Sequence, residues 1–182
     1  MHKKFLIFGG TGSLGKKLID RLLPTNNVVV YSRDEAKHWT CRNALTNSDL
    51  KDRTQHLQFF VGDVRDRDRV SDTIRQVRPD IVIIAAALKQ VDTCELSPSE
   101  SIMTNLIGTQ NIIDAVNKSN AVSSVMFVST DKACSPVNVY GMCKATSERI
   151  VTSQAQSGRS DVRYLVVRYG NVLESRGSII PL

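Results

Sequence analysis

The amino-acid sequence predicts an α/β fold: a doubly wound sheet of about six parallel strands, with helices on both faces, formed as a single domain over residues 1–182. Two observations support this fold class. Short apolar runs alternate with longer amphipathic stretches along the chain, and the first apolar run leads directly into a glycine-rich loop. Parallel strands need crossover connections, which helices between the apolar runs would provide.

Six apolar runs predict the strands. Most of them are continuously apolar, which is typical of parallel strands buried on both faces. Between them apolar residues recur with helical spacing, and the fourth helix is expected to begin at Ser97-Pro98-Ser99-Glu100, a capping box with proline at the first helical position. The predicted strands are residues 5–8, 28–31, 57–61, 81–86, 125–128 and 164–167, and the predicted helices are residues 14–23, 35–46, 67–77, 99–118 and 138–156.

Composition and charge exclude several classes of protein. Hydrophobic residues make up 41% of the chain and charged residues 23%, as in ordinary soluble domains, and no apolar run approaches the roughly 20 residues that span a bilayer. The net charge is +6, but basic and acidic residues alternate over residues 63–69 and only 5% of residues are aromatic, so we expect no nucleic-acid partner. The four cysteines form no Cys-x-x-Cys pair, so we expect free thiols and no metal site. Without a signal-peptide pattern, we expect a cytoplasmic protein that does not contact a membrane.

The loop after the first strand carries glycines at intervals of three residues. Glycines let backbone N–H groups approach a pyrophosphate, and the N-terminus of the following helix favours an anion. A tight turn without a ligand is the alternative, but the position between first strand and first helix favours a Rossmann-type dinucleotide site. The residues expected to contact the cofactor here are Gly9, Thr11, Gly12, Ser13, Leu14 and Gly15.

The end of the second strand indicates which dinucleotide binds. NAD-binding domains tend to place a carboxylate there for the ribose 2′-hydroxyl, whereas this chain has Ser32-Arg33. A guanidinium pairs well with a phosphate, so NADP is favoured over NAD. The alternative is that Arg33 is a solvated loop charge and that Asp34 contacts the ribose.

Two further strand ends are expected to contact the cofactor. After the third strand, Asp63 could accept from the amino group of adenine, and Val64 could pack against the ring. After the fourth strand, the small side chains of Ala85 and Ala86 would let the cofactor lie close to the backbone.

Tyr140 and Lys144 lie four residues apart in a predicted helix and so share a face. A lysine ammonium beside a phenol would lower the pKa of Tyr140, and the lysine could also hold the ribose of a nicotinamide. The fifth strand leads into Thr130-Asp131-Lys132, at the edge where open α/β sheets bind ligands, so these groups form a candidate acid–base set. The alternatives are a surface lysine near a half-buried tyrosine, and a purely structural Asp131–Lys132 pair.

Together these segments resemble the extended short-chain dehydrogenase/reductases, and in particular the inverting UDP-N-acetylglucosamine (UDP-GlcNAc) 4,6-dehydratases of polysaccharide biosynthesis. The resemblance implies that NADP takes a hydride from C4 of the sugar, that C5 loses a proton and C6 loses water, and that the hydride returns to C6 with inversion at C5. It covers essentially the whole chain through TGSLG, YSRDE, GDVRD, AAALKQV, TNLIGTQN, STDKA, VNVYGMCK and RYGNVLESRGSIIP.

The resemblance also implies roles for individual residues. Lys132 would be the base at C5, Asp131 the acid that assists loss of the C6 hydroxyl, and Thr130 would orient the sugar. Tyr140 and Lys144 would serve oxidation at C4 and hold the cofactor. Further implied contacts are Lys89, Thr130, Asn171 and Arg176 with the UDP-sugar, and Ser32, Arg33, Asp34, Glu35, Lys37 and Val172 with NADP.

Family members continue beyond the position of Leu182 into a smaller substrate domain. We therefore expect the cofactor domain of a longer enzyme, which binds NADP but converts UDP-GlcNAc poorly or not at all. The helices over 99–118 and 138–156 would form the dimer seam common in this superfamily, so the resemblance implies a homo-oligomer.

Two other functions remain open. The first is another short-chain enzyme on the same scaffold, such as a nucleotide-sugar 4-epimerase or a keto-sugar reductase, and the second is a non-catalytic NADP-binding module. An epimerase does not need the acid and base that Asp131 and Lys132 would supply. A non-catalytic module tends to lose the catalytic set, which this chain retains.

Overall fold

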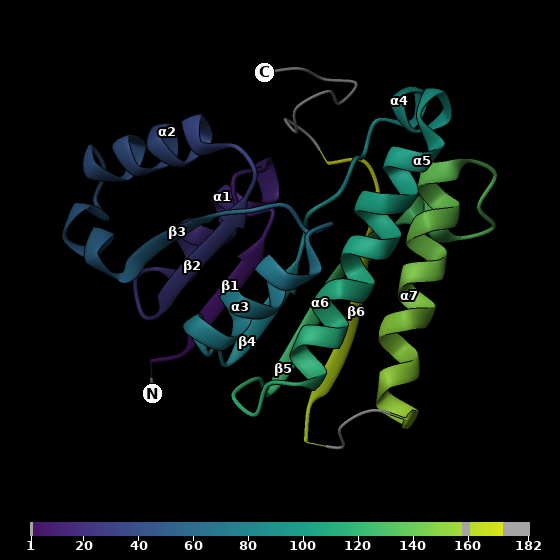
Figure 1. Ribbon diagram of the computed structural model, residues 1–182. Helices are drawn as coiled ribbons and strands as arrows, with labels where there is room; N and C mark the ends of the chain where they lie inside the picture. Colours follow the sequence, from purple (N-terminus) through teal and green to yellow (C-terminus); the bar gives the residue numbers. More distant parts are fainter. Residues whose placement is uncertain (1, 158–160, 173–182) are drawn as a thin grey trace.

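The computed structural model describes residues 2–157 and 161–172 and contains the six predicted strands (Figure 1). They form one sheet in the order β3-β2-β1-β4-β5-β6, in which every neighbouring pair is parallel. The predicted doubly wound α/β fold is confirmed. The strands are β1 (Lys4–Phe8), β2 (Asn27–Ser32), β3 (Leu57–Val61), β4 (Ile81–Ile84), β5 (Ser124–Thr130) and β6 (Arg163–Tyr169).

Helices connect the strands and cover both faces of the sheet (Figure 1). Two 3-10 turns, η1 (Lys51–His56) and η3 (Asp131–Ala133), were not predicted. The α-helices are α1 (Ser13–Leu22), α2 (Glu35–Thr46), α3 (Arg67–Val77), α4 (Val91–Leu96), α5 (Pro98–Ser101), α6 (Gly108–Asn117) and α7 (Val139–Ser157).

The segment predicted as one helix over 99–118 is divided. It consists of α5, a π-helical stretch η2 (Ile102–Ile107) and α6, and the unpredicted helix α4 precedes it. A residue before proline is disfavoured in helical conformation, which separates α4 from the helix that starts at Pro98. Ser97 accordingly has φ −134° and ψ 64°.

The predicted capping box at the start of this helix is wrong. The Ser97 side chain makes no capping hydrogen bond, although Pro98 does occupy the first helical turn. The carboxylate of Glu100 instead accepts a hydrogen bond from Arg65 at 2.7 Å. A charged partner from another loop has replaced the local contact.

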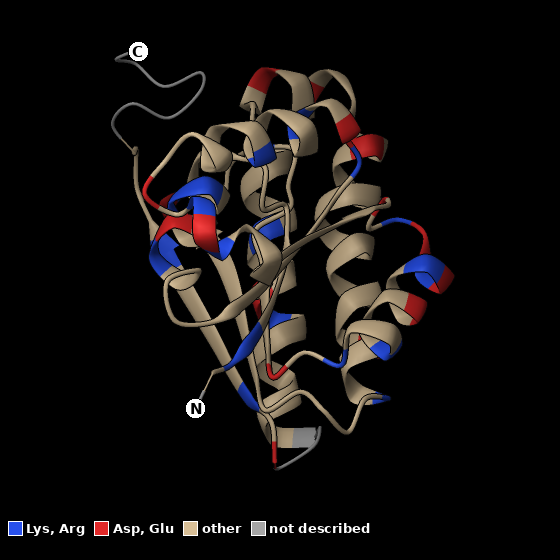
Figure 2. Ribbon diagram, turned by 90° about the vertical axis from the view of Figure 1, so that its left-hand side faces the viewer, with Lys and Arg blue, Asp and Glu red and all other residues tan. Residues whose placement is uncertain are grey.

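The central strands are buried on both faces, which explains their continuous apolar runs. Leu6 and Phe8 of β1 belong to a core shared with α3, α6 and α7, whereas Ile7 belongs to a second core shared with α1 and α2. Successive residues of a strand point to opposite faces. Acidic residues lie among the basic ones in Figure 2, as the alternating charges in the sequence indicate.

The two central strands, β1 and β4, mark the point where the order of strands reverses. Ligands of open α/β sheets bind outside the carboxyl ends of strands at such a point. Gly9 and Ala85 follow β1 and β4 directly, and Ser32 and Thr130 end β2 and β5. The predicted site residues therefore come to one edge of the sheet.

Candidate functional site

The glycine-rich loop packs backbone to backbone against its neighbours. Gly9 has a φ of +86°, and a Cβ there would lie 2.6 Å from the backbone nitrogen of Ala86. A Cβ on Gly15 would lie 2.3 Å from the carbonyl oxygen of Gly10. Only glycine fits these two positions. Gly12 is the N-cap of α1, whose first turn, beginning with Ser13 and Leu14, contains no acidic residue, so its N–H groups favour an anion.

Hydroxyl groups connect the glycine loop to α2. Thr11 Oγ1 donates to Ser32 Oγ at 3.3 Å, and Ser32 Oγ lies 2.7 Å from Nε2 of His38. His38 is buried and its ring centroid is 4.9 Å from that of Phe59. Burial lowers the pKa of His38 and so favours the neutral ring. Sequence reasoning missed His38, whose only signal was its position one turn into the helix after Ser32.

Asp34 caps helix α2. Its side chain accepts from the backbone N–H of Lys37 at 3.0 Å and also pairs with the Lys37 ammonium. These hydrogen bonds lower the pKa of Asp34. Two of the predicted cofactor residues are therefore engaged with each other, and Glu35, between them in sequence, is exposed.

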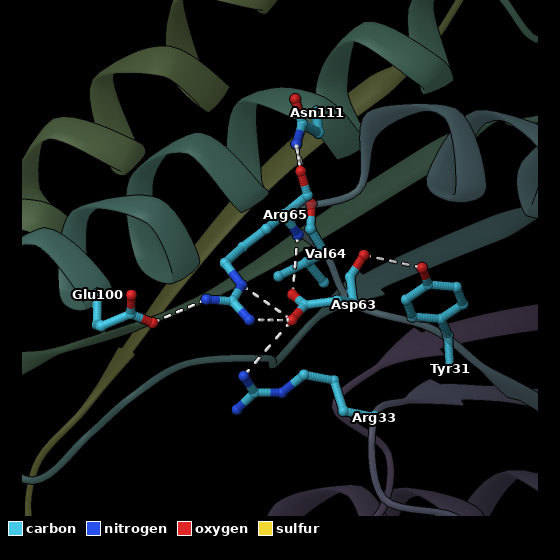
Figure 3. A network of polar contacts seen from close by, with 7 residues as sticks. All are labelled: Tyr31, Arg33, Asp63, Val64, Arg65, Glu100 and Asn111. Carbon is cyan, nitrogen blue, oxygen red and sulfur yellow. Dashed lines mark hydrogen bonds and ion pairs between the residues drawn. The ribbon is translucent and has the colours of Figure 1, made fainter.

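Arg33 is half-exposed and turns toward the end of β3 rather than standing alone in solvent. Its Nη1 lies 3.5 Å from Oδ2 of Asp63 (Figure 3). Arg65 holds the same carboxylate through its backbone N–H to Oδ1 at 3.0 Å, and through Nε and Nη2 to Oδ2 at 2.9 and 2.6 Å. Sequence reasoning missed Arg65, and the alternating Arg and Asp residues over 63–69 were the available signal.

The backbone beside this carboxylate is held from two sides (Figure 3). The Tyr31 hydroxyl donates to the carbonyl of Asp63 at 3.0 Å, and Asn111 donates to the carbonyl of Val64, also at 3.0 Å. Val64 is buried against the start of α6, where a Cβ on Gly108 would lie 2.6 Å from its Cγ2. The backbone that follows β3 is therefore held by side chains of β2 and α6.

The residues at the end of β5 and directly after it form the connected cluster that the sequence predicted. Thr130 Oγ1 donates to Asp131 Oδ1 at 2.9 Å, and Lys132 Nζ lies 3.3 Å from the same oxygen. Lys132 Nζ is also 3.5 Å from Oδ1 of Asn171, one of the predicted substrate residues. The hydrogen bond from Thr130 and the pairing with Lys132 lower the pKa of Asp131, although partial burial opposes them.

The Tyr140 phenol lies beside the Thr130 hydroxyl of this cluster. Burial, followed by the proximity of Tyr169, raises the pKa of Tyr140 to about 12, while the Thr130 hydroxyl lowers it. The predicted lowering of this pKa by Lys144 is not found. Lys144 is 3% exposed, its Nζ lies 4.1 Å from the centroid of the Phe127 ring, and burial lowers its own pKa to about 7. A lysine that loses its charge near neutral pH cannot strongly stabilise a phenolate.

An ion pair ties β6 to the helix that carries Tyr140 and Lys144. Arg168 donates from Nε and Nη2 to the two carboxylate oxygens of Glu148, at 2.8 and 2.5 Å, and from Nη1 to Cys134 Sγ at 2.9 Å. The Glu148 side chain is only 10% exposed. These contacts hold together α7, the end of β6 and the segment after η3.

The remaining predicted residues lie around the same edge. Ala85 and Ala86 are half-buried beneath the glycine loop, whereas Lys89, Asn171 and Val172 are exposed. Asn105 of η2, which sequence reasoning missed, clamps the segment before Lys89 by accepting from Leu88 N at 2.8 Å and donating to Leu88 O at 2.9 Å. Arg176 lies outside the described residues.

The part of the chain that the structure describes contains no cluster of three or more His, Cys, Asp or Glu side chains suited to a metal ion. None of its helices has the length and apolar character needed to cross a membrane. All four cysteines are free thiols.

Known proteins resemble the chain over nearly its whole length. A relative from Campylobacter jejuni named UDP-N-acetylglucosamine 4,6-dehydratase (inverting) is 44% identical over 98% of this chain and 52% of its own length. A relative from Rickettsia bellii named UDP-glucose 4-epimerase is 41% identical over 100% of this chain and 52% of its own. The crystal structure of Pen from Bacillus thuringiensis superposes with a TM-score of 0.89 at 37% identity, over 98% of this chain and 53% of that one.

The chain thus spans about half the length of the curated relatives that it matches. The sequence profile of one protein family, described as "Polysaccharide biosynthesis protein", matches residues 5–182. This match includes the glycine loop, the cluster after β5 and the strand that carries Arg168. The chain therefore belongs to the polysaccharide biosynthesis protein family.

Proposed function

We propose that this chain is the cofactor-binding half of an NADP-dependent nucleotide-sugar 4,6-dehydratase, which converts UDP-GlcNAc to a UDP-4-keto-6-deoxy-hexosamine with inversion at C5. The observation that carries the proposal is the cluster at the end of β5, in which Thr130 donates to Asp131, Lys132 pairs with the same carboxylate oxygen, and the Thr130 hydroxyl lies beside Tyr140. A carboxyl group and an amine side by side would supply the acid and the base that removal of water from adjacent carbons requires. The identity with the Campylobacter relative supports the same reaction.

The described residues fit a dinucleotide at the other end of the site. Gly9 and Gly15 let the loop pack closely against neighbouring backbone, Gly12 adds no side chain at the N-cap of α1, and α1 begins without an acidic residue, so its first N–H groups suit a pyrophosphate. Arg33 would pair with the 2′-phosphate, and Lys144 would hold the nicotinamide ribose. NADP, when bound, would accept a hydride from C4 of the sugar and return it to C6.

The side chains after β5 would move the protons. Tyr140 would take the proton of the C4 hydroxyl. Because the Thr130 hydroxyl lies beside Tyr140 and donates to Asp131 at 2.9 Å, a proton would pass from Tyr140 through Thr130 to Asp131. This path matters because the lowered pKa of Asp131 makes it a carboxylate before the reaction begins.

Asp131 and Lys132 would then act on neighbouring carbons. Once protonated, Asp131 would donate its proton to the C6 hydroxyl, which leaves as water, while Lys132, in its neutral amine form, would take the proton from C5. A proton returned to the opposite face of C5 would invert that centre. In this scheme the proton of the C4 hydroxyl leaves in the water formed at C6, so no external acid is consumed.

A nucleotide-sugar 4-epimerase is the second candidate, because relatives of nearly equal identity carry that name. An epimerase would use Tyr140 and the cofactor but would need no acid at C6 and no base at C5. Lys132→Met therefore separates the two candidates: it removes the base at C5, so it should abolish a dehydratase and leave an epimerase largely active. Tyr140→Phe should abolish turnover in both cases.

The test combines turnover with binding. UDP-GlcNAc is incubated with the protein in D₂O and followed by NMR, while calorimetry measures NADP and NAD affinities. A 4-keto-6-deoxy product deuterated at C5 supports the dehydratase, and ring couplings report the configuration at C5, whereas a C4 epimer supports the second candidate. NADP binding without product supports a cofactor-binding half that is insufficient for turnover. Absence of both would refute the proposal.

A further inference from the structure

Asp63 is shared unequally by two arginines (Figure 3). Arg65 makes three hydrogen bonds to its carboxylate, at 2.6 to 3.0 Å, whereas Arg33 approaches it only through Nη1 at 3.5 Å. The side chain of Arg33 is 52% exposed, against 22% for Asp63. The guanidinium of Arg65 is therefore bound to the Asp63 carboxylate, whereas the guanidinium of Arg33 remains available to a ligand.

Arg65 is held in place on both sides. Its Nη1 lies 2.7 Å from Oε2 of Glu100 in α5, and its own backbone N–H takes part in binding Asp63. The Tyr31 hydroxyl donates to the carbonyl of Asp63, and Asn111 donates to the carbonyls of Val64 and Arg65, so the backbone at Arg65 is also held. The Arg65 guanidinium thus bridges two carboxylates from separate elements, and this bridge fixes its orientation.

The two oxygens of Asp63 differ in the donors they receive. Oδ2 accepts from Nε and Nη2 of Arg65 and faces Arg33, while Oδ1 receives the backbone N–H of Arg65. A carboxylate oxygen has about two acceptor positions, so Oδ1 still has room for one donor such as the amino group of adenine. The oxygen nearest Arg33 is the one that Arg65 neutralises.

Removing Arg65 would change the charge beside Arg33. Burial on its own would raise the pKa of Asp63, but hydrogen bonds and charge from Arg65, together with Arg33, bring it below its usual value, so Asp63 is a carboxylate. Without Arg65 this carboxylate would retain Arg33 as its guanidinium partner and would repel an incoming phosphate dianion. The repulsion follows directly from Coulomb's law at these separations.

Resting on the proposed function, we infer that Arg65 is a specificity-determining residue: by neutralising Asp63 it keeps Arg33 available to the 2′-phosphate, and so sets the preference for NADP over NAD. Arg65 acts through Asp63 and Arg33 and is a positioning residue. NAD lacks the 2′-phosphate and is much less sensitive to this charge.

The test measures binding rather than turnover. Calorimetric titrations with NADP and with NAD compare the unaltered protein with Arg65→Gln, with the double variant Arg65→Gln/Asp63→Asn, and with Arg67→Gln. The last is the matched control, because Arg67 lies two residues further on and pairs with Asp114 at 3.4 Å, outside the network. Urea unfolding of each variant checks that the fold is retained.

The ratio of NADP to NAD affinity should fall about tenfold in Arg65→Gln, equivalent to about 1.4 kcal/mol, and should not change in Arg67→Gln. In the double variant the ratio should return toward that of the unaltered protein, even if both affinities fall through loss of an adenine contact. A double variant that keeps the low ratio overturns the inference, since Arg65 would then contact the phosphate itself. An unchanged ratio in Arg65→Gln also overturns it, whereas failure of the unaltered protein to bind either dinucleotide refutes the proposed function as well.

Discussion

Lys144→Met tests the energetic cost of the buried lysine in the proposed site. The Lys144 side chain is 3% exposed and lies over the Phe127 ring, and burial lowers its pKa from 10.5 to about 7. Methionine is similar in length, flexible and uncharged, so it should fill the same space without the desolvation cost. The variant should therefore be more stable than the unaltered protein at neutral pH.

The size of the effect follows from the two pKa values. Unfolding returns Lys144 to water, where its pKa is 10.5, so between pH 7 and 10.5 the unfolded chain binds more protons than the folded chain. The free energy of unfolding therefore rises with pH in this window, at up to about 1.4 kcal/mol per pH unit. Because the folded-state Lys144 is already about half deprotonated at pH 7, the gain between pH 7 and pH 9 is about 2 kcal/mol. The methionine variant should lack this gain.

Urea unfolding followed by circular dichroism at pH 7, 8 and 9 measures the difference between the two proteins. Taking the difference removes the contribution of other groups, including the Cys41 and Cys143 thiols, whose pKa values burial raises. Lys51→Met, at an exposed lysine, is the matched control for exchanging a lysine side chain for methionine. If the Lys144→Met and unaltered curves run parallel from pH 7 to 9, the lysine is not buried as described and the reasoning fails.

Three further outcomes are expected. Gly9→Ala places a Cβ 2.6 Å from a backbone nitrogen at a φ of +86°, so it should lower the melting temperature and abolish NADP binding. Gly12→Ala is the control. A Cβ on Gly12 would come no closer than 3.5 Å to any atom outside its chain neighbours, so this variant should have nearly the melting temperature of the unaltered protein. Burial lowers the pKa of His38, so the free energy of unfolding should fall as the pH decreases below about 6.5, where the unfolded chain takes up a proton, and His38→Phe should flatten this dependence in urea titrations at pH 7.5 and 5.5. Arg168→Met leaves the mostly buried Glu148 carboxylate without its guanidinium and should lower the free energy of unfolding in urea, and Glu148→Gln in the same chain should recover part of that loss.

Most of the fold could be predicted because its signals are local. Each of the six apolar runs became a strand, with bounds that differ from the prediction by two residues or fewer at either end. The division of the segment over 99–118 was harder to predict, because a π-helical stretch has no distinct periodicity in a short sequence. The predicted capping box at Ser97 failed for a different reason: the Glu100 carboxylate accepts a hydrogen bond from Arg65, a charged partner in a different loop.

The sequence predicted which residues form the cluster after β5, but not how deeply Tyr140 and Lys144 are buried. Thr130, Asp131 and Lys132 are adjacent in sequence, so their hydrogen bonds follow once a strand ends there. The direction of the pKa shift at Tyr140 was predicted incorrectly, because the burial of both Tyr140 and Lys144 depends on elements packed around α7.

The sequence by itself determined the succession of strands and helices, the glycine-rich loop between the first strand and the first helix, and the set of polar residues at the carboxyl ends of the strands. These properties depend on spacing along the chain and on backbone sterics, which neighbouring residues control. Only the tertiary structure decided that Asp63 lies between Arg33 and Arg65, that His38 meets Ser32, and which lysine is buried. Hydrogen bonds and desolvation depend on which distant segments the sheet brings together, and sequence spacing carries no direct record of that.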